Sequence, residues 1–505
     1  MNIYRFLLLS ITFFSSIGAY SQRIVYTEPE NDDTRRMNFE IIGKVGGNFL
    51  IHKNVRNKNF VAVYDNEMKQ IHKEEHEYLP EDRLINMDFF PYTDHAYMVY
   101  QYQRKNVVYC KTVKIDSRGK KISDVIELDT SHIGFNASNK IYSVITSEDK
   151  SQLMVFKINS RNKSRYIVTT ILFDDALNLK KRSRFVLNMD ERDDYLDEFN
   201  VDNEGDFVFT KFNRTGNETI KATFLLWKPA LSDSLHTAEV PQKEIWLDEP
   251  ILKVDNVNKR YFLTSFYYEA RRGNIEGFYF YVWDKQTQMP VMQNTLVLGD
   301  ELRKEAKGDA NMKMAFNDYF VRSVIIKRDG GFIINTEAYY TTSRNANWNR
   351  YNYLYGNYGS QYDYYSSSPL YNSWYWRNRY NNSSSMRHHA DNITVLSFDK
   401  DGKLQWSNVI HKEQFDDESD DRISYQLMNT GSQVHYIFNL DEKRALLLND
   451  YTLSPGGEVN RNPTLKNLDR GYEFLPKYGK QVSARQLIIP CFYRNYICFA
   501  KIEYN

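Results

Sequence analysis

The side chains best suited to recognition are aromatic rings concentrated in one segment, residues 343–391. This segment contains ten Tyr and three Trp, and Asn, Ser and Gly supply most of the remainder. Such a composition, with some Arg, is typical of recognition loops, and flat rings suit sugars, bases or protein surfaces. The alternative is a low-complexity loop, partly disordered or packed over the fold. The expected binding residues are Trp348, Tyr351, Tyr353, Tyr355, Tyr364, Tyr365, Tyr371, Trp374, Tyr375 and Trp376.

A second set of candidates consists of arginines that recur in connections between predicted strands. They are Arg56, Arg104, Arg161, Arg214, Arg272, Arg344 and Arg494. Their guanidinium groups could form a ring that binds carboxylates or phosphates of a partner. Alternatively, these segments are hairpin loops that use Asn and Gly for positive φ. Their arginines would then pair with acidic connections at 190–198 and 416–421, each exposed pair contributing ~0–1 kcal/mol.

Histidine and acidic side chains give little support for a metal site. His72-Lys-Glu-Glu-His76 has the spacing of the inverted zinc-protease motif, which needs a helix. The repeats place it in a strand, where the two rings would lie ~13 Å apart. His388 and His389 are adjacent in a predicted loop, and the acidic connections lack the spacing of a calcium loop. We find no G-x-S-x-G, P-loop or G-x-G-x-x-G motif, and we predict no metal and no cofactor.

Two of the three cysteines could form a disulfide. Cys491 and Cys498 lie symmetrically about Arg494-Asn495, so a two-residue hairpin would place them directly opposite each other. That position is a hydrogen-bonded pair, which is a strained setting for a disulfide. An oxidising compartment would favour the bond. The sequence leaves this pairing open, and Cys110 is predicted to be a buried free thiol.

The first 21 residues are predicted to be a cleaved secretory signal. A basic start is followed by an apolar run over residues 6–19, and Ala19-Tyr20-Ser21 supplies small residues before a cut at Gln22. The run is too short to span a membrane, and no later apolar run reaches ~18 residues. We therefore expect export to the periplasm or the cell surface, without a transmembrane segment in the mature chain.

The rest of the chain repeats. An apolar strand that runs into a turn, usually led by Asp, occurs eight times, and the spacings are 51, 58, 54, 56, 115, 51 and 54 residues. The doubled interval contains the aromatic insertion. Each unit can be divided into four strands with Gly, Asn and Asp at the turns. The copies begin at Val61, Thr112, Thr170, Phe224, Phe280, Val395, Leu446 and Ala500.

A period near 50 residues made of short strands and tight turns is similar to the β-propeller superfamily. The sequence shows neither Trp-Asp pairs nor a Kelch pattern, so the resemblance concerns architecture alone. It implies an all-β fold: a single propeller of about eight four-stranded antiparallel blades over residues 22–505, or seven if the last unit merges with the first. The last unit lacks its fourth strand, and residues 22–27 are expected to supply it and close the ring.

Composition limits the function. Lys plus Arg (66) nearly cancels Asp plus Glu (65), so nothing in the overall charge indicates nucleic acid. The leading hypothesis is an exported, non-catalytic binding or scaffolding module that recognises a cell-envelope protein or glycan through the insertion and the arginine loops. The alternative is a carbohydrate-active hydrolase or lyase with an axial carboxylate and tyrosine site. Buried acids with shifted pKa values at the axis would distinguish the second from the first.

Overall fold

The computed structural model describes most of the chain after residue 21. The described residues are 22–29, 37–80, 84–134, 137, 140–162, 164–189, 194–214, 219–307, 311–343, 347–355, 386–417, 419–442, 445–463, 465, 471–494 and 496–504. The predicted signal at residues 1–21 lies outside them. So do seven predicted binding residues, which are Arg344, Tyr364, Tyr365, Tyr371, Trp374, Tyr375 and Trp376.

The fold is all-β and of the β-propeller type, with antiparallel sheets whose strands follow one another in chain order. The first sheet contains β2 (Met37–Val45), β3 (Asn48–Val55), β4 (Lys58–Tyr64) and β5 (Gln70–Glu75). The second contains β6 (Leu84–Pro91), β7 (His95–Arg104), β8 (Val107–Asp116) and β9 (Ile126–His132). The third contains β10 (Ser143–Thr146), β11 (Gln152–Asn162), β12 (Arg165–Asp174) and β13 (Leu179–Asn188).

The next two units share one nine-stranded sheet. One unit contains β14 (Asp194–Val201), β15 (Phe207–Arg214), β16 (Ile220–Lys228) and β17 (His236–Val240). The other contains β19 (Ile251–Asp255), β20 (Arg260–Tyr268), β21 (Gly277–Asp284) and β22 (Met289–Val297). Between them, β18 (Trp246–Leu247) pairs with both β16 and β20. These two predicted blades are therefore joined through the main chain.

Three more sheets complete the described chain. One contains β23 (Tyr319–Ile326), β24 (Phe332–Ser343), β25 (Met386–Phe398) and β26 (Leu404–Ile410), with β27 (Phe415–Asp416) on β25. The next contains β28 (Tyr425–Asn429), β29 (Val434–Glu442), β30 (Ala445–Leu453) and β31 (Val459–Arg461). The last contains β32 (Tyr472–Phe474), β33 (Lys480–Ser483), β34 (Gln486–Tyr493), β35 (Tyr496–Glu503) and β1 (Arg23–Tyr26). Short helices connect strands: α2 (Asp300–Lys307), η2 (Met312–Met314), α3 (Arg350–Tyr355) and η3 (Pro476–Tyr478).

The Asp-led turns that mark the repeat have a local cause. The Asp65 carboxylate accepts hydrogen bonds from the backbone N–H groups of Glu67 and Lys69, at 2.9 Å each. Asp116, Asp174 and Asp399 make the same pair of contacts two and four residues ahead. A short acidic side chain thus satisfies the donors that the turn leaves unpaired.

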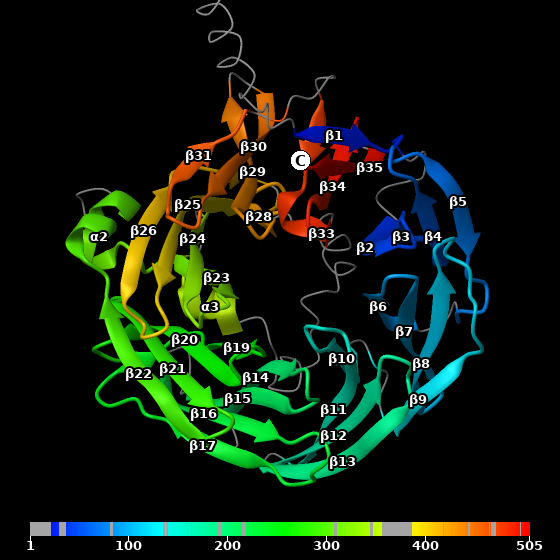
Figure 1. Ribbon diagram of the computed structural model, residues 1–505, viewed down its shortest axis with the longest axis horizontal. Coiled ribbons are helices and arrows are strands. Elements are labelled where there is room, and N and C mark those ends of the chain that lie inside the picture. The colour runs from blue at the N-terminus through cyan, green and yellow to red at the C-terminus, as the bar shows by residue number, and fades with distance from the viewer. Residues whose placement is uncertain are drawn as a thin grey trace, which may run out of the picture.

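Hydrophobic side chains fill the space between consecutive units. Eight clusters of buried residues each combine two units that follow one another, and one of the eight combines the last unit with the first. In that cluster the rings of Phe39 and Phe499 meet edge to face, 5.2 Å apart. Each fully buried ring of this size contributes ~1.5–3 kcal/mol. Figure 1 shows the units side by side around a common centre.

The N-terminal strand pairs where the sequence predicted. β1 is antiparallel to β35, with Arg23 opposite Glu503 and Tyr26 opposite Ala500. The backbone N–H of Thr27 extends the pairing to the carbonyl of Phe499, at 2.9 Å. β1 therefore covers an edge of β35 that would otherwise be unpaired.

The aromatic insertion is shorter than predicted. β24 continues to Ser343, and β25 begins at Met386, so residues 386–391 are strand rather than loop. The rings of Tyr340 and His389 stack across the two strands at 4.4 Å, which favours this extension.

Among the described residues, no helix is long and apolar enough to cross a membrane.

Candidate active site

The first strand of each unit lies nearest the centre, and these strands carry ionisable side chains (Figure 1). Glu40 on β2, Glu198 on β14 and Glu249 just before β19 all have raised pKa values, about 8, about 8 and about 7. Burial is the main cause, and nearby carboxylates such as Asp197 and Asp248 raise the pKa values further. At neutral pH each of these groups can hold a proton, as a general acid must.

Glu198 occupies a distorted backbone position. The register between β14 and β15 shifts between Asp197 and Asn200, and Glu198 has a φ of 55° within this bulge. Its carboxylate accepts a 2.8 Å hydrogen bond from the backbone N–H of Leu252 on β19. Positive φ at a residue with a β-carbon costs energy and is enriched at functional positions. The bulge therefore directs the Glu198 side chain toward β19 of the neighbouring unit. A regular strand pair would not need this distortion.

A cavity of about 340 Å³ opens beside the inner strands β23 and β28, against α3. It is lined by Arg322, Ser323, Tyr339, Tyr353, Asp420, Ile423, Ser424, Tyr425, Leu427 and Lys477. We call it the inner cavity. Its polar lining combines a guanidinium, an ammonium, a carboxylate, hydroxyls and three phenols. Such a mixture can hold an anionic group and exchange protons with it.

The charge of the inner cavity comes from a buried network behind it. Glu337 on β24 is fully buried and meets Arg322 at 3.0 Å and Lys412 at 2.9 Å. Ser424 donates to the same carboxylate at 2.6 Å. Burial alone would raise the pKa of Glu337, but the two cations lower it overall, so it stays ionised. Two positive charges against one negative leave the network with one excess positive charge.

Two phenols of the inner cavity are placed for proton transfer. Tyr425 is buried, and its hydroxyl has no hydrogen-bond partner among the described residues. The Tyr339 hydroxyl lies 2.9 Å from Nδ1 of His388 on β25. Burial raises the pKa of both phenols, so both remain protonated. Tyr425 can donate a proton to a ligand, and Tyr339 can pass its own proton to His388.

The lining of the inner cavity also includes a carboxylate, that of Asp420. Asp420 pairs with Lys477 at 2.7 Å. Burial would raise the pKa of Asp420, but Lys477 lowers it overall, so this group is ionised. Glu249, in contrast, has a pKa of about 7. The positive charge of Arg322 also acts on Glu249. The interior therefore contains carboxyl groups of both protonation states.

The described part of the aromatic insertion packs onto the interior. Trp348 donates its indole N–H to Asp318 at 3.1 Å, and its ring meets Phe320 edge to face. Tyr353 lines the inner cavity, with its ring 4.8 Å from that of Tyr339. Tyr351 packs against the hydrophobic cluster between the fourth and fifth units. Tyr355 ends α3.

Sequence reasoning missed the residue that anchors this segment. Arg350 is buried at the start of α3, and its Nε lies 2.5 Å from the carboxylate of Asp248. It also donates to the backbone carbonyl of Tyr319. The only signal in the sequence was a basic residue among aromatic ones, which resembles the other arginines of the segment. Arg322, Tyr339 and Tyr425 were also missed, because they lie in strands far apart in the chain, whereas Asp420 belongs to the acidic connection at 416–421 that the sequence had indicated.

The predicted arginines do not gather at the inner cavity. Arg56, Arg272 and Arg494 are exposed on connections of different units, and Arg104 is exposed at the end of β7. Arg161 lies near the end of β11, and its side chain is outside the described residues. Arg214 differs from the expected exposed arginine, because it is buried, stacks on the Tyr195 ring at 4.7 Å and donates to its hydroxyl at 2.9 Å. None of these arginines lines the cavity.

The weaker sequence candidates have local partners. His72 lies in β5 and contacts Glu74 at 3.0 Å, whereas His76 contacts the Tyr78 hydroxyl at 2.9 Å. His388 and His389 lie in β25 and not in a loop. His389 contacts Thr342 at 3.0 Å.

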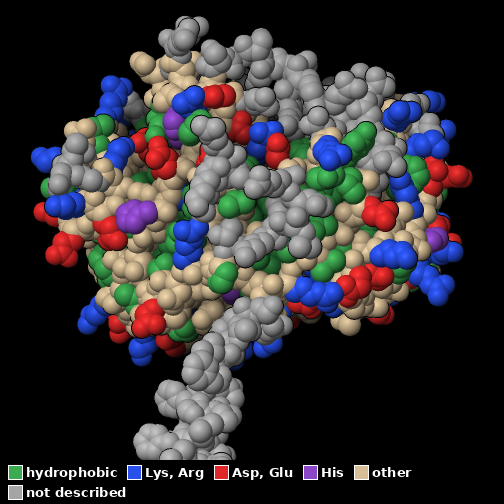
Figure 2. Space-filling model, turned by 90° about the horizontal axis from the view of Figure 1, so that it is seen from above, with side chains coloured by type: hydrophobic (Ala, Val, Ile, Leu, Met, Phe, Trp, Pro, Cys, Tyr) green, Lys and Arg blue, Asp and Glu red, His purple; other side chains and the backbone are tan. Residues whose placement is uncertain are grey.

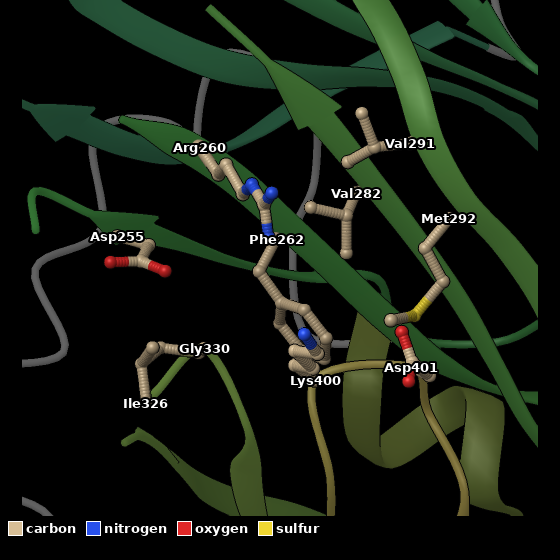
Figure 3. Close-up of a pocket in the computed structure, with 10 residues that line it drawn as sticks. All are labelled: Asp255, Arg260, Phe262, Val282, Val291, Met292, Ile326, Gly330, Lys400 and Asp401. Atoms are coloured by element: carbon tan, nitrogen blue, oxygen red, sulfur yellow. The ribbon is translucent and has the colours of Figure 1, made fainter. Parts of the chain in front are cut away.

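A smaller cavity of about 160 Å³ lies between the fifth and sixth units, where Asp255 and Arg260 face Lys400 and Asp401 across apolar side chains (Figure 3). Arg260 lies 3.5 Å from Asp284, and Asn258 donates to Asp255 at 2.8 Å. Its charges are thus partly paired within the protein. The inner cavity, with its excess positive charge and its unpartnered phenol, is the stronger candidate.

No protein-family model and no curated protein matches the chain. Among solved structures, it is similar to an ulvan lyase of polysaccharide lyase family PL25 bound to a saccharide, at 10% identity and a TM-score of 0.36, covering 81% of this chain and 90% of that one. It is similar to polysaccharide lyase Uly1 at 9% identity and a TM-score of 0.39, covering 84% and 90%. It is also similar to prolyl oligopeptidase B from Galerina marginata at 8% identity and a TM-score of 0.42, covering 92% and 56%.

The expectation of a non-catalytic binding module is wrong. The interior contains the feature that was expected to distinguish an enzyme, because Glu40, Glu198 and Glu249 are carboxyl groups with pKa values raised by burial. The prediction failed because it relied on catalytic motifs along the sequence, whereas Glu198 and Glu249 act on each other from two neighbouring units.

Proposed function

We propose that the eight units form one closed propeller, with β1 as the outer strand of the last blade. The pairing of β1 with β35 and the hydrophobic cluster between the last and first units support closure. On this proposal residues 22–505 are a single domain with one insertion. The signal at residues 1–21 directs it to the periplasm or the cell surface.

We propose that the protein is a carbohydrate-active enzyme whose active site is the inner cavity, and that it cleaves uronate-containing polysaccharides by β-elimination. The observation that carries this proposal is the juxtaposition of Arg322, with its excess positive charge, and the unpartnered Tyr425 hydroxyl in one cavity. A buried donor without a partner is costly, and a ligand oxygen would satisfy it.

The chemistry follows from the charges. Arg322 would bind the carboxylate of a uronate ring and stabilise the negative charge that develops when the neighbouring C5–H bond breaks. Tyr339 would accept that proton while passing its own to His388. Tyr425 would protonate the leaving glycosidic oxygen as the C4–O bond breaks and a C4=C5 double bond forms. Because Asp420 and Glu337 are held ionised by cations, neither suits the acid role of a hydrolase.

The substrate class and the reaction can be tested together. Polysaccharides with and without uronate units would be incubated with the protein, and new reducing ends and the ultraviolet absorbance of the unsaturated product would be measured. A lyase yields both signals, and only with uronate-containing chains. Reducing ends without the absorbance would show hydrolysis, directed by Glu249 and Glu198, and would overturn the elimination.

A single hydroxyl tests the assignment of the site. Tyr425→Phe removes an oxygen that has no hydrogen-bond partner among the described residues, so the fold should be kept. Losing a general acid should reduce kcat by ~10²-fold or more. Tyr109→Phe on β8, away from the cavity, is the matched control and should retain full activity. Equal activity of the two variants would remove Tyr425 from the mechanism.

A further inference from the structure

Two buried thiols face each other in the sheet that also contains β1. Cys491 on β34 and Cys498 on β35 are register partners, and their sulfur atoms lie 2.9 Å apart. Neither residue has exposed surface. Hydrogen-bonded antiparallel partners have Cα atoms ~5.5 Å apart, which is within the range that a disulfide spans even though the bond is strained in this setting. The sulfur atoms would need to approach by about 0.9 Å to reach bonding distance.

We propose that Cys491 and Cys498 are joined by a disulfide in the mature protein. The oxidant is a disulfide-bearing partner, either a small molecule or a thiol–disulfide oxidoreductase. One cysteine thiolate attacks the oxidant and forms a mixed disulfide, releasing one reduced thiol. The second cysteine then attacks its neighbour's sulfur, releasing the other reduced thiol. Two cysteine thiols are oxidised, one disulfide is reduced, and the two protons end on the released thiols.

The bond must form before the hairpin is covered. Burial raises the pKa of the Cys491 thiol in the folded protein, and the thiolate is the reactive form. β34 and β35 are adjacent in the chain, so their hairpin can form before the neighbouring units pack on it. The same burial would then shield the completed bond from reductants. The proposal is independent of the catalytic one, since neither sulfur lines the inner cavity.

The bond would reinforce the strand to which β1 is attached. β35 lies between β34 and β1 in the sheet order. Cross-linking β34 to β35 limits the ways in which this hairpin can unfold. Loss of the bond should therefore destabilise the edge at which the first and last units meet, before it affects the other sheets.

Cys110 provides an internal reference. It is buried in β8, away from the sheet that holds the pair, and the chain has three cysteines. The full-length protein would be refolded with oxidised glutathione, denatured without reductant, treated with a maleimide and weighed by mass spectrometry. We expect one adduct without reductant and three after reduction. The variant Cys110→Ser should give no adduct without reductant and two adducts after reduction. The double variant Cys491→Ser/Cys498→Ser should give one adduct in both conditions.

Because the labelling is done on denatured protein, it does not depend on the stability of any variant. Peptide mapping of the unreduced sample should locate a cross-link between residues 491 and 498. Three adducts without reductant would overturn the proposal, as would a cross-link that involves Cys110. A further expected result is a lower melting temperature on reduction of the wild type and no change for the double variant.

Discussion

At the scale of single residues, Glu198 combines several departures from ordinary strand chemistry. It has a positive φ, interrupts the register of β14 and carries a carboxyl group whose pKa is about 8. A glycine at the same position would relieve the backbone strain and remove the buried acid. A chain that keeps an acid there uses it, and the proposed role is to hold a proton in the interior at neutral pH.

The raised pKa of Glu198 predicts a specific pH dependence of stability. Its folded pKa of about 8 exceeds the ordinary value of 4.5, so the folded state binds the proton more tightly. Between these values the unfolded chain has already lost its proton, and stability therefore falls as pH rises from about 4.5 to about 8. Glu198→Gln mimics the protonated acid and should remove part of this decline.

The measurement is the free energy of unfolding in denaturant from pH 5 to pH 8. The difference between Glu198→Gln and the wild type should grow with pH, in favour of the variant. Glu503→Gln is the matched control, because the pKa of Glu503 is lowered by its contact with Gln486, and its variant should show no such gain. Parallel curves for the wild type and Glu198→Gln would show that Glu198 is ionised in the folded protein.

At the scale of elements, α3 is fixed to the interior by one buried ion pair and several rings. Arg350 and Asp248 are both nearly inaccessible, and the ring of Phe320 lies 3.9 Å from the Arg350 guanidinium. Removing one partner of a buried pair leaves an uncompensated charge, which costs ~3–5 kcal/mol. α3 also supplies Tyr353 to the inner cavity, so its anchoring and the shape of the site are linked.

Arg350→Met should therefore lower the free energy of unfolding by ~3 kcal/mol and loosen α3. Double replacement, Arg350→Met with Asp248→Asn, should recover part of the loss because no charge remains unpaired. The exposed pair Arg387 and Asp417 gives the control, since Arg387→Met should leave the free energy unchanged. Chemical denaturation measures all three variants, and an unaffected Arg350→Met would mean that the rings alone hold α3.

The sequence predicted the strands and turns better than the site. Asp-led turns and alternating apolar residues depend on neighbours within a few positions, so they can be read along the chain. Arg322 and Tyr425 meet only because two units pack side by side, and Glu337 pairs with Lys412, which lies 75 positions further along the chain. Nothing local distinguishes these residues from ordinary strand residues. The composition of the aromatic insertion predicted a binding role, but of its described residues only Tyr353 lines the cavity.

At the scale of the whole molecule, charges of both signs are interspersed over the face seen in Figure 2, in keeping with the near-equal counts of acidic and basic residues.

The two ends of the described chain are joined in one sheet. β1 and the rest of its sheet are separated by nearly the whole sequence, yet they share main-chain hydrogen bonds. We therefore expect the stability of the last sheet to depend on the four residues of β1.

Deleting residues 22–27 should expose the edge of β35 and the side chains beneath it. We expect a lower melting temperature and concentration-dependent association, measured by thermal unfolding and size-exclusion chromatography, because unpaired edges bind other edges. A matched variant that keeps the length but replaces residues 23–26 with Gly and Ser should behave in the same way. A deletion variant that remains monomeric and melts at the wild-type temperature would show that β1 is dispensable.

The strand β18 joins the fourth and fifth units through the main chain. Among the described residues, the first and second units share one main-chain hydrogen bond, from the N–H of Gly46 to the carbonyl of Thr93, whereas β18 forms strand pairs with both β16 and β20. Side-chain contacts can separate by a small rotation, whereas a hydrogen-bonded ladder must break. The fourth and fifth units should therefore open and close as one cooperative block, and slow breathing motions should concentrate at the other boundaries. The inner cavity is lined by residues of β23 and β28, which belong to two sheets with no strand pair between them among the described residues. We therefore expect more motion at the cavity than at the joint formed by β18.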